Sequence, residues 1–219
     1  MCKRVKNLPT RARLLARRPT SVFINCPFDD DYRPYFRAIV FTVVRCGFTP
    51  RCALEVIDGG STRISKIEKL IEDCPLGIHD ISRTQLDPIN LLPRFNMPLE
   101  LGLFLGAKRY GDAKQKRKKC LVLDTERFRF QRFMSDIAGQ DIEGHGGDIN
   151  ELVAKVRAFL NSTLKTEPLP SAATIRNEYE GFNSNLPDIC VRLKLRTDEL
   201  EYKDFTWMVA DYVTVTDAT

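Results

Sequence analysis

Hydrophobic and polar residues follow strand and helix periods in turn along the first part of the chain. The apolar run SVFINC (21–26) is typical of a buried strand, and YRPYFRAIVFTVVRC (32–46) repeats its apolar positions at helical spacing. The segment FTPRCALEV (48–56) predicts a second strand. Ser61 stands at a cap position, and the apolar positions that follow predict a helix from 61 to about 74.

The middle of the chain continues the alternation. LGIHDIS (76–82) predicts a third strand, and a loop over 83–96 separates it from a largely apolar helix that we expect to begin at Pro98. CLVLD (120–124) predicts a fourth strand. Residues 125–148 show no clear period, and helical spacing of apolar residues returns over 149–160.

Alternating strands and helices are typical of a parallel sheet with helices on both faces. The pattern therefore predicts a doubly wound α/β domain with a mainly parallel sheet over 21–164, preceded by a basic N-terminal tail over 1–20. KTEPLPS (165–171) has the composition of a linker. Beyond it, 172–213 predicts two or three short helices, a small C-terminal helical module suited to docking or dimerisation.

Positive charge is concentrated in two segments. The formal net charge is +5, and the segment Lys3–Arg18 holds seven Lys and Arg residues with no acid beside them. A second basic cluster, KQKRKK, occupies Lys114–Lys119. Both would contact nucleic acid in one interpretation, whereas in the other they are a solvated tail and a solubilising loop.

Composition narrows the class of protein. Hydrophobic residues make up 43% of the chain, which is enough for a sizeable core. No apolar run approaches the roughly 20 residues that cross a bilayer, and the N-terminus lacks the apolar segment of a secretory signal. We therefore expect a cytoplasmic protein without membrane contact. The seven cysteines show no CxxC spacing, which favours reduced thiols and predicts no metal site.

Polar residues collect after the predicted strands. In an open parallel sheet, ligands bind beyond the carboxyl ends of the strands, where the following loops and helix starts converge. An aromatic ring, amides, carboxylates and an arginine suit stacking, ribose contacts and phosphate pairing, so we expect these residues to face one cleft that binds a nucleotide. The expected set is Asn25, Phe28, Asp29, Arg63, Asp80, Ser82, Arg83, Asn96, Met97 and Glu100.

Several familiar motifs are missing from the sequence. It has no GxGxxG after the first strand and no GxxxxGK[ST], so the dinucleotide fingerprint and the P-loop are excluded. It has no GxSxG elbow, and the presence of only two histidines argues against a catalytic Ser-His-Asp triad. The chemistry that remains is that of carboxylates. His79 alternates with apolar neighbours and is expected to be structural.

Glu100 stands out because RFNMPLELGLFLGAKRYG (94–111) otherwise predicts a helix buried on most sides. In the first turn after Pro98 the helix dipole would favour the ionised carboxylate, whereas burial would oppose ionisation. A carboxylate here could stabilise or trap an oxocarbenium-like centre. The alternative is an ordinary first-turn acid. Gly102 and Gly106 of this helix are expected to pack against the sheet.

Four segments together carry a family resemblance. SVFINCPFDDDY, STRISKIEKLIEDC, GIHDIS and MPLELGLFLGAKRYG, in this order, resemble the superfamily of Toll/interleukin receptor (TIR) domains and nucleoside 2-deoxyribosyltransferases. Within it the chain looks closest to bacterial effectors of anti-phage defence, including the N-glycosidase toxins associated with retrons. The resemblance covers about residues 20–160 and implies a flavodoxin/TIR-like fold.

The resemblance also implies an activity, the cleavage of an N-glycosidic bond in NAD(P) or a related nucleotide that serves as substrate, without a further cofactor. Glu100 matches the glutamate that attacks the anomeric carbon in the transferases and contacts the ribose in TIR enzymes. Asn96 and Met97 stand where the transferases carry an Asp-x-Gly turn, so hydrolysis and transfer both stay open.

Three functions follow as hypotheses. The first is an NAD(P) glycohydrolase or nucleoside (deoxy)ribosyl hydrolase that acts as a toxin, controlled by homo-oligomerisation or by a partner protein of the defence system. The second is a nucleotide-sensing or TIR-type scaffold module without turnover. The third, compatible with either, is nucleic-acid binding through the two basic segments.

Overall fold

The computed structural model describes residues 20–55, 57–86, 91–164 and 168–218. The strands are β1 (Ser21–Asn25), β2 (Thr49–Arg51), β3 (Leu76–Asp80), β4 (Lys119–Asp124) and β5 (Ile142–Gly144). The α-helices are α1 (Arg33–Arg45), α2 (Arg63–Asp73), α3 (Asn96–Tyr110), α4 (Ile149–Thr163), α5 (Ala172–Leu193) and α6 (Tyr202–Ala218). Short 3₁₀ turns η2 (Gln115–Arg117), η3 (Arg129–Arg132) and η4 (Ser135–Ile137) join them.

All five strands pair in parallel, in the order β2-β1-β3-β4-β5. This confirms the predicted doubly wound α/β fold, and the order is the flavodoxin-like one. The chain reverses its direction of strand addition after β1 and β2, so the topological switch point lies at the carboxyl ends of β1 and β3. Ligands of this class of sheet bind beyond the strand ends at such a point.

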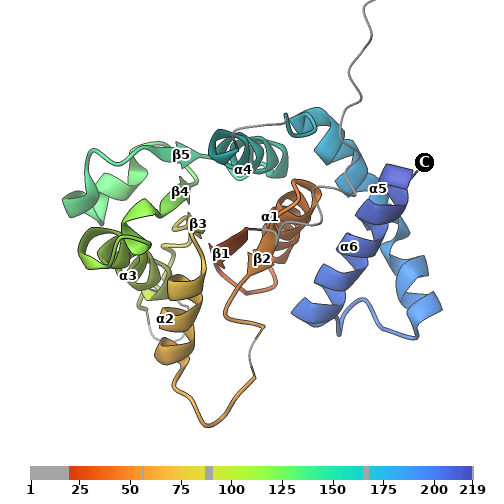
Figure 1. Ribbon diagram of the computed structural model, residues 1–219, viewed down its shortest axis with the longest axis horizontal. Coiled ribbons are helices and arrows are strands. Elements are labelled where there is room, and N and C mark those ends of the chain that lie inside the picture. Colours follow the sequence, from red (N-terminus) through yellow and green to blue (C-terminus); the bar gives the residue numbers. More distant parts are fainter. Residues whose placement is uncertain (1–19, 56, 87–90, 165–167, 219) are drawn as a thin grey trace, which may run out of the picture.

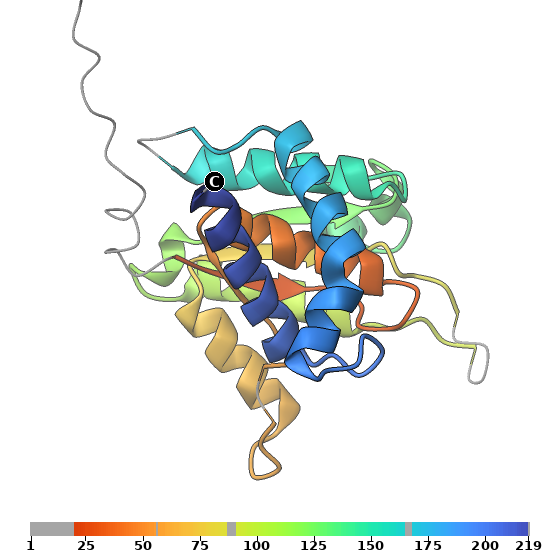
Figure 2. The same ribbon diagram turned by 90° about the vertical axis from the view of Figure 1, so that its right-hand side faces the viewer.

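Helices cover both faces of the sheet (Figure 1). On one face, α1 and α4 pack over Val22 and Ile24 of β1, and α5 and α6 add an outer layer beyond α1. On the other face, α2 and α3 pack over Phe23. Figure 2 looks onto the outer layer, where α5 and α6 run side by side in front of α1.

The C-terminal helices share the core of the α/β domain. Phe182 of α5 and Phe205 of α6 are buried in the same hydrophobic cluster as Phe41 of α1. They form two helices of 22 and 17 residues, longer than the two or three short ones expected. The division at 20/21 and around the linker stays a prediction, since residues 1–19 and 165–167 lie outside the described ranges.

The structure corrects several element boundaries. β2 ends at Arg51 instead of continuing to 56, because it is an edge strand that contains Pro50, which has no N–H to donate, and the chain turns where Arg51 pairs with Glu55. The N-cap of α2 is Thr62 and not Ser61, since the Thr62 hydroxyl accepts from Ser65 N. β5 was not predicted, because three residues cannot show a period.

Contrary to the expectation from the sequence, the glycines of α3 do not pack against the sheet. Beyond the helix's own backbone and the adjacent residues, no atom lies within 4 Å of where a Cβ would stand at Gly102 or Gly106, because α3 turns Leu101 and Phe104 toward the core instead. Within the described ranges, none of the helices combines the length and apolar character that crossing a membrane requires.

A buried ion pair holds the outer layer to α1. Arg45 Nη2 donates to Glu178 Oε1 of α5 at 2.8 Å, and its Nη1 lies 3.4 Å from Asp217 Oδ1 of α6. The side chains of Arg45 and Glu178 are only 8% and 16% exposed. Since a buried charge that loses its partner is costly, this pair contributes to holding α5 in place.

We expect Glu178→Gln to lower the free energy of unfolding by about 2 kcal/mol, below the usual cost of a broken buried pair because Asp217 still faces Arg45. Urea denaturation at pH 7 measures the change. The control is Asp141→Asn, which removes an exposed pair with Arg127 and should leave the midpoint unchanged. Equal midpoints for both variants would contradict the role of Arg45.

Candidate active site

The side-chain amide of Asn25 joins three elements at the switch point. Asn25 ends β1, and its Nδ2 donates to His79 Nδ1 of β3 at 3.1 Å and to the carbonyl of Met97 in α3 at 2.9 Å. Asn25 and Met97 are 2% and 5% exposed. The start of α3 is therefore fixed beside the ends of β1 and β3.

His79 is structural, as expected. Its ring is fully buried, with its centroid 4.8 Å from that of Phe104 in an edge-to-face contact, and burial lowers its pKa to about 3. The neutral ring can accept the Asn25 hydrogen bond at Nδ1. Gly77 makes room for this arrangement, since a Cβ there would stand 2.6 Å from His79 Nε2 and 2.9 Å from Phe104.

Glu100 lies in the second turn of α3, not in the first, because the helix begins at Asn96, two residues before Pro98. The dipole effect fades after the first turn, so burial prevails. The residue is 6% exposed, and burial raises the pKa of Glu100 to about 7, against which the positive charge of Arg63 acts. The carboxyl group accepts no hydrogen bond from the residues described, and it is half-ionised near neutral pH.

Asp80, at the end of β3, organises the neighbouring loops. It is fully buried, and its Oδ2 accepts from the Tyr32 hydroxyl at 2.5 Å while its Oδ1 accepts from Ser82 N at 2.8 Å. His145 Nε2 lies 3.2 Å from Oδ2 without the alignment of a hydrogen bond. Burial, and then the charge of Asp80, raise the pKa of Tyr32. Both carboxylate oxygens are thus occupied by the protein itself.

A second buried carboxylate fixes the loop after β3. Asp124 ends β4, and its Oδ1 accepts from Arg129 Nε at 2.8 Å. The same guanidinium donates to the carbonyl of Ser82 at 2.7 Å and to the hydroxyl of Thr84 at 2.6 Å. Burial raises the pKa of Asp124, and the Arg129 bond opposes that shift. Ser82 is therefore held through both its N–H and its carbonyl.

Ion pairs connect the β1–α1 loop to the segment before α3. Arg83 Nη2 lies 3.3 Å from Asp29 Oδ1 and 3.2 Å from Asp31 Oδ2. Arg94 Nη1 lies 3.7 Å from Asp29 Oδ2. Asp29 also accepts from Tyr32 N at 3.1 Å, just before α1 begins. The predicted residues Asp29 and Arg83 are thus brought into contact.

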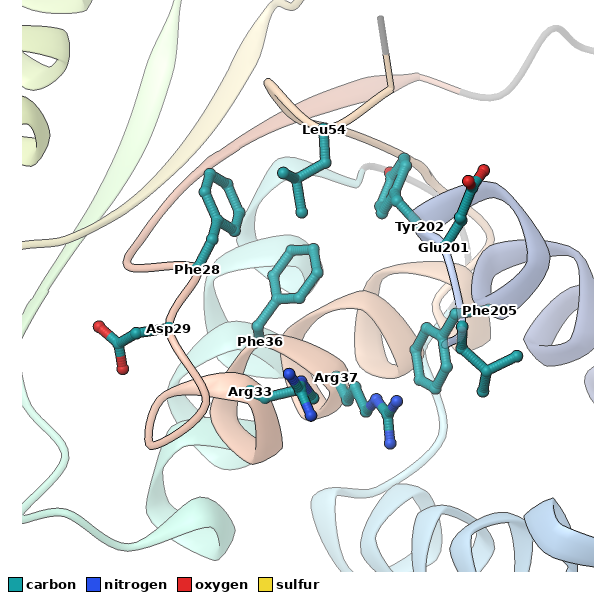
Figure 3. Close-up of a pocket in the computed structure, with 10 residues that line it drawn as sticks. Phe28, Asp29, Arg33, Phe36, Arg37, Leu54, Glu201, Tyr202 and Phe205 are labelled. Atoms are coloured by element: carbon teal, nitrogen blue, oxygen red, sulfur yellow. The ribbon is translucent and has the colours of Figure 1, made fainter. Parts of the chain in front are cut away.

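The predicted residues divide into two groups around the end of β1. Asn25 and Met97 are bonded, Glu100 and Arg63 interact electrostatically, and Asn96 is exposed at the start of α3. Phe28 and Asp29 instead line a small pocket between α1 and α6 (Figure 3), and Glu100 is not among its lining residues. Phe28 packs edge-to-face on Phe36, with the ring centroids 5.2 Å apart.

Sequence reasoning missed four residues of this region, Tyr32, Asp124, Arg129 and His145. Tyr32 and His145 carry no periodic signal, because one precedes a helix and the other follows a three-residue strand. Asp124 ends a predicted strand just as Asp80 does, so the rule on carboxyl ends could have found it.

The structure shows that one cation of the second basic cluster is buried. Lys118 is 2% exposed, and its Nζ donates to the carbonyls of Ile71 and Cys74 at the end of α2. Lys118 is therefore a buried C-cap and cannot contact nucleic acid, a correction to the expectation for Lys114–Lys119. The other cations of this cluster are exposed, and Lys3–Arg18 lies outside the described residues.

Comparison with known proteins does not place the chain in a family. None of the protein-family models matches the sequence, and a search of curated proteins finds no significant relative. The functional argument therefore depends on the geometry of the residues described above.

We expect Glu100→Gln to stabilise the protein at pH 8 and to have little effect at pH 4.5. Because the folded pKa of about 7 lies above the ordinary 4.5, stability falls as pH rises through this window and the full cost is present above about pH 7. For such a shift in pKa, linkage gives a difference of about 3 kcal/mol in the free energy of unfolding, and solvent screening reduces it to about 2 kcal/mol. Thermal unfolding of both proteins across pH 4.5–8 measures the difference. A constant difference would contradict the raised pKa.

Proposed function

We propose that this chain cleaves the N-glycosidic bond of NAD(P) or a related nucleotide, with Glu100 as the reactive carboxylate. The observation that carries the proposal is a buried glutamate with a pKa of about 7, held beside the switch point of a doubly wound sheet. Strongly shifted groups at such crevices are candidates for catalysis.

Cleavage of this N-glycosidic bond can proceed with a single carboxylate. Departure of the base leaves oxocarbenium character at the anomeric carbon, and an ionised Glu100 would stabilise or covalently trap that charge. A nicotinamide leaves a pyridinium-type substrate as a neutral molecule, so the leaving group requires no general acid. Arg63 at the start of α2 would pair with a phosphate, and its positive charge favours ionised Glu100. Water or a second acceptor would complete hydrolysis or transfer.

Asp80 was expected to contact the nucleotide, and we propose a positioning role for it instead. Since Tyr32 and Ser82 occupy its oxygens, we assign it to positioning the loops, with Asn25, Ser82 and Met97 acting from the same buried edge. The resemblance to defence effectors extends the proposal to a toxic role restrained by oligomerisation or by a partner protein.

A second candidate is a nucleotide-sensing or scaffold module without turnover. It is favoured by the low exposure of Glu100, since a substrate must reach a side chain that is 6% exposed. Calorimetry with NAD separates the two functions, because a sensor binds saturably without releasing nicotinamide.

We expect the purified chain to release nicotinamide from NAD or NADP, measured by chromatography, and Glu100→Gln to lower the rate at least 100-fold. The rate should rise as pH increases through about 7 and then level off, because the ionised carboxylate is the active form. The matched control is Glu72→Gln, an exposed glutamate on α2. Full activity in Glu100→Gln, or intact NAD at every pH, would overturn the assignment.

A further inference from the structure

A small pocket between α1 and α6 has no part in the proposed reaction. It is partly open to solvent, and its volume of about 90 Å³ is far less than the 300–1,000 Å³ typical of sites for drug-sized ligands. Because α1 and α6 cover one face of the sheet and α3 covers the other, the pocket and Glu100 lie on opposite faces. A ligand enclosed here is small.

The interior of the pocket is apolar and largely aromatic. Phe28, Phe36 and Tyr202 turn their rings toward one another in Figure 3, and the centroids of Phe36 and Tyr202 are 6.0 Å apart. The Tyr202 hydroxyl donates to the carbonyl of Pro50 at 2.7 Å, so the pocket receives only its ring. Leu54 stands at the lip and is 42% exposed. These groups offer contact to a flat or branched hydrocarbon body.

Two cations lie at the rim of the pocket, and one of them, Arg33, is paired with the carboxylate of Asp30. Arg33 and Arg37 follow each other by one turn of α1, and Figure 3 shows their guanidinium groups side by side. The carboxylates of Asp29 and Glu201 also border the pocket, but both point away from it (Figure 3). Asp29 is already shared between Arg83 and Arg94.

Arg37 lacks a counter-charge. In the described ranges it forms no ion pair with a carboxylate, and its guanidinium lies over the ring of Phe205 at 5.2 Å and donates to the carbonyl of Thr197 at 3.5 Å. Burial and the charge of Arg33 lower the pKa of Arg37. A half-buried guanidinium without a carboxylate partner is unfavourable, and a bound anion would pair with it through charge-assisted hydrogen bonds.

We propose that this pocket binds a small organic anion, a monocarboxylate with a flat or branched apolar body. The body lies among Phe28, Phe36 and Tyr202, and the carboxylate accepts from Arg37. Inorganic phosphate fits less well, because it has no apolar part to meet the rings. The site is independent of the proposed reaction at Glu100.

The test compares benzoate with benzamide, which has the same ring without the charge. Calorimetric titration of the full chain should show benzoate binding at least ten times more tightly than benzamide. This comparison needs no variant. Equal affinities, or no heat from benzoate up to about 10 mM, would overturn the proposal.

Substitutions inside and outside the pocket test where benzoate binds. Arg37→Gln should remove the preference for benzoate, whereas Lys203→Gln, an exposed cation of α6 outside the pocket, should keep it. Circular dichroism verifies that both fold. Glu100→Gln should leave benzoate affinity unchanged, so failure of the reaction and failure of this site are separate results. Benzoate preference that persists in folded Arg37→Gln would refute the assignment.

Discussion

The two hydrogen bonds of the Asn25 amide are the contact on which the candidate site depends. One amide nitrogen reaches both β3 and the first turn of α3, among residues that are almost fully buried. Both acceptors must be present, because a buried donor without a partner costs as much as a lost hydrogen bond. His79 meets this requirement only as the neutral ring, and its burial keeps it neutral. The position of α3, and with it that of Glu100, follows from this small buried network.

Two carboxyl groups at the same edge of the sheet have opposite surroundings. Asp80 receives a hydroxyl and a backbone N–H, so its negative charge is compensated by the protein. Glu100 receives neither from the described residues, and burial raises its pKa to about 7 against the opposing charge of Arg63. Groups that are compensated hold a structure together, whereas a group poised between two protonation states can respond to a ligand. This contrast favours Glu100 over Asp80 as the reactive residue.

The C-terminal helices add a pocket on the face of the sheet that α1 covers, opposite α3. Tyr202 and Phe205 of α6 complete the ring-lined pocket, whose other walls come from α1, the loops after β1 and β2, and the segment just before α6. The pocket exists because α6 docks on α1, and the pair of Arg45 with Glu178 holds the adjacent α5 to the same helix. Packing of the C-terminal segment therefore creates a second candidate site without touching the first.

Local periodicity in the sequence was sufficient to predict the doubly wound α/β class, four of the five strands and the helices over 33–45, 63–73 and 149–163, because strand and helix periods are set by neighbouring residues. The rule on carboxyl ends then selected Asn25, Asp80 and Glu100. Tertiary structure decided the rest: the protonation of Glu100, the partners of Asp80 and the burial of Lys118. The Tyr32–Asp80 and Lys118–Cys74 contacts join residues that are 48 and 44 positions apart in the chain. Such residues meet only after the sheet has formed, and no local pattern encodes their meeting.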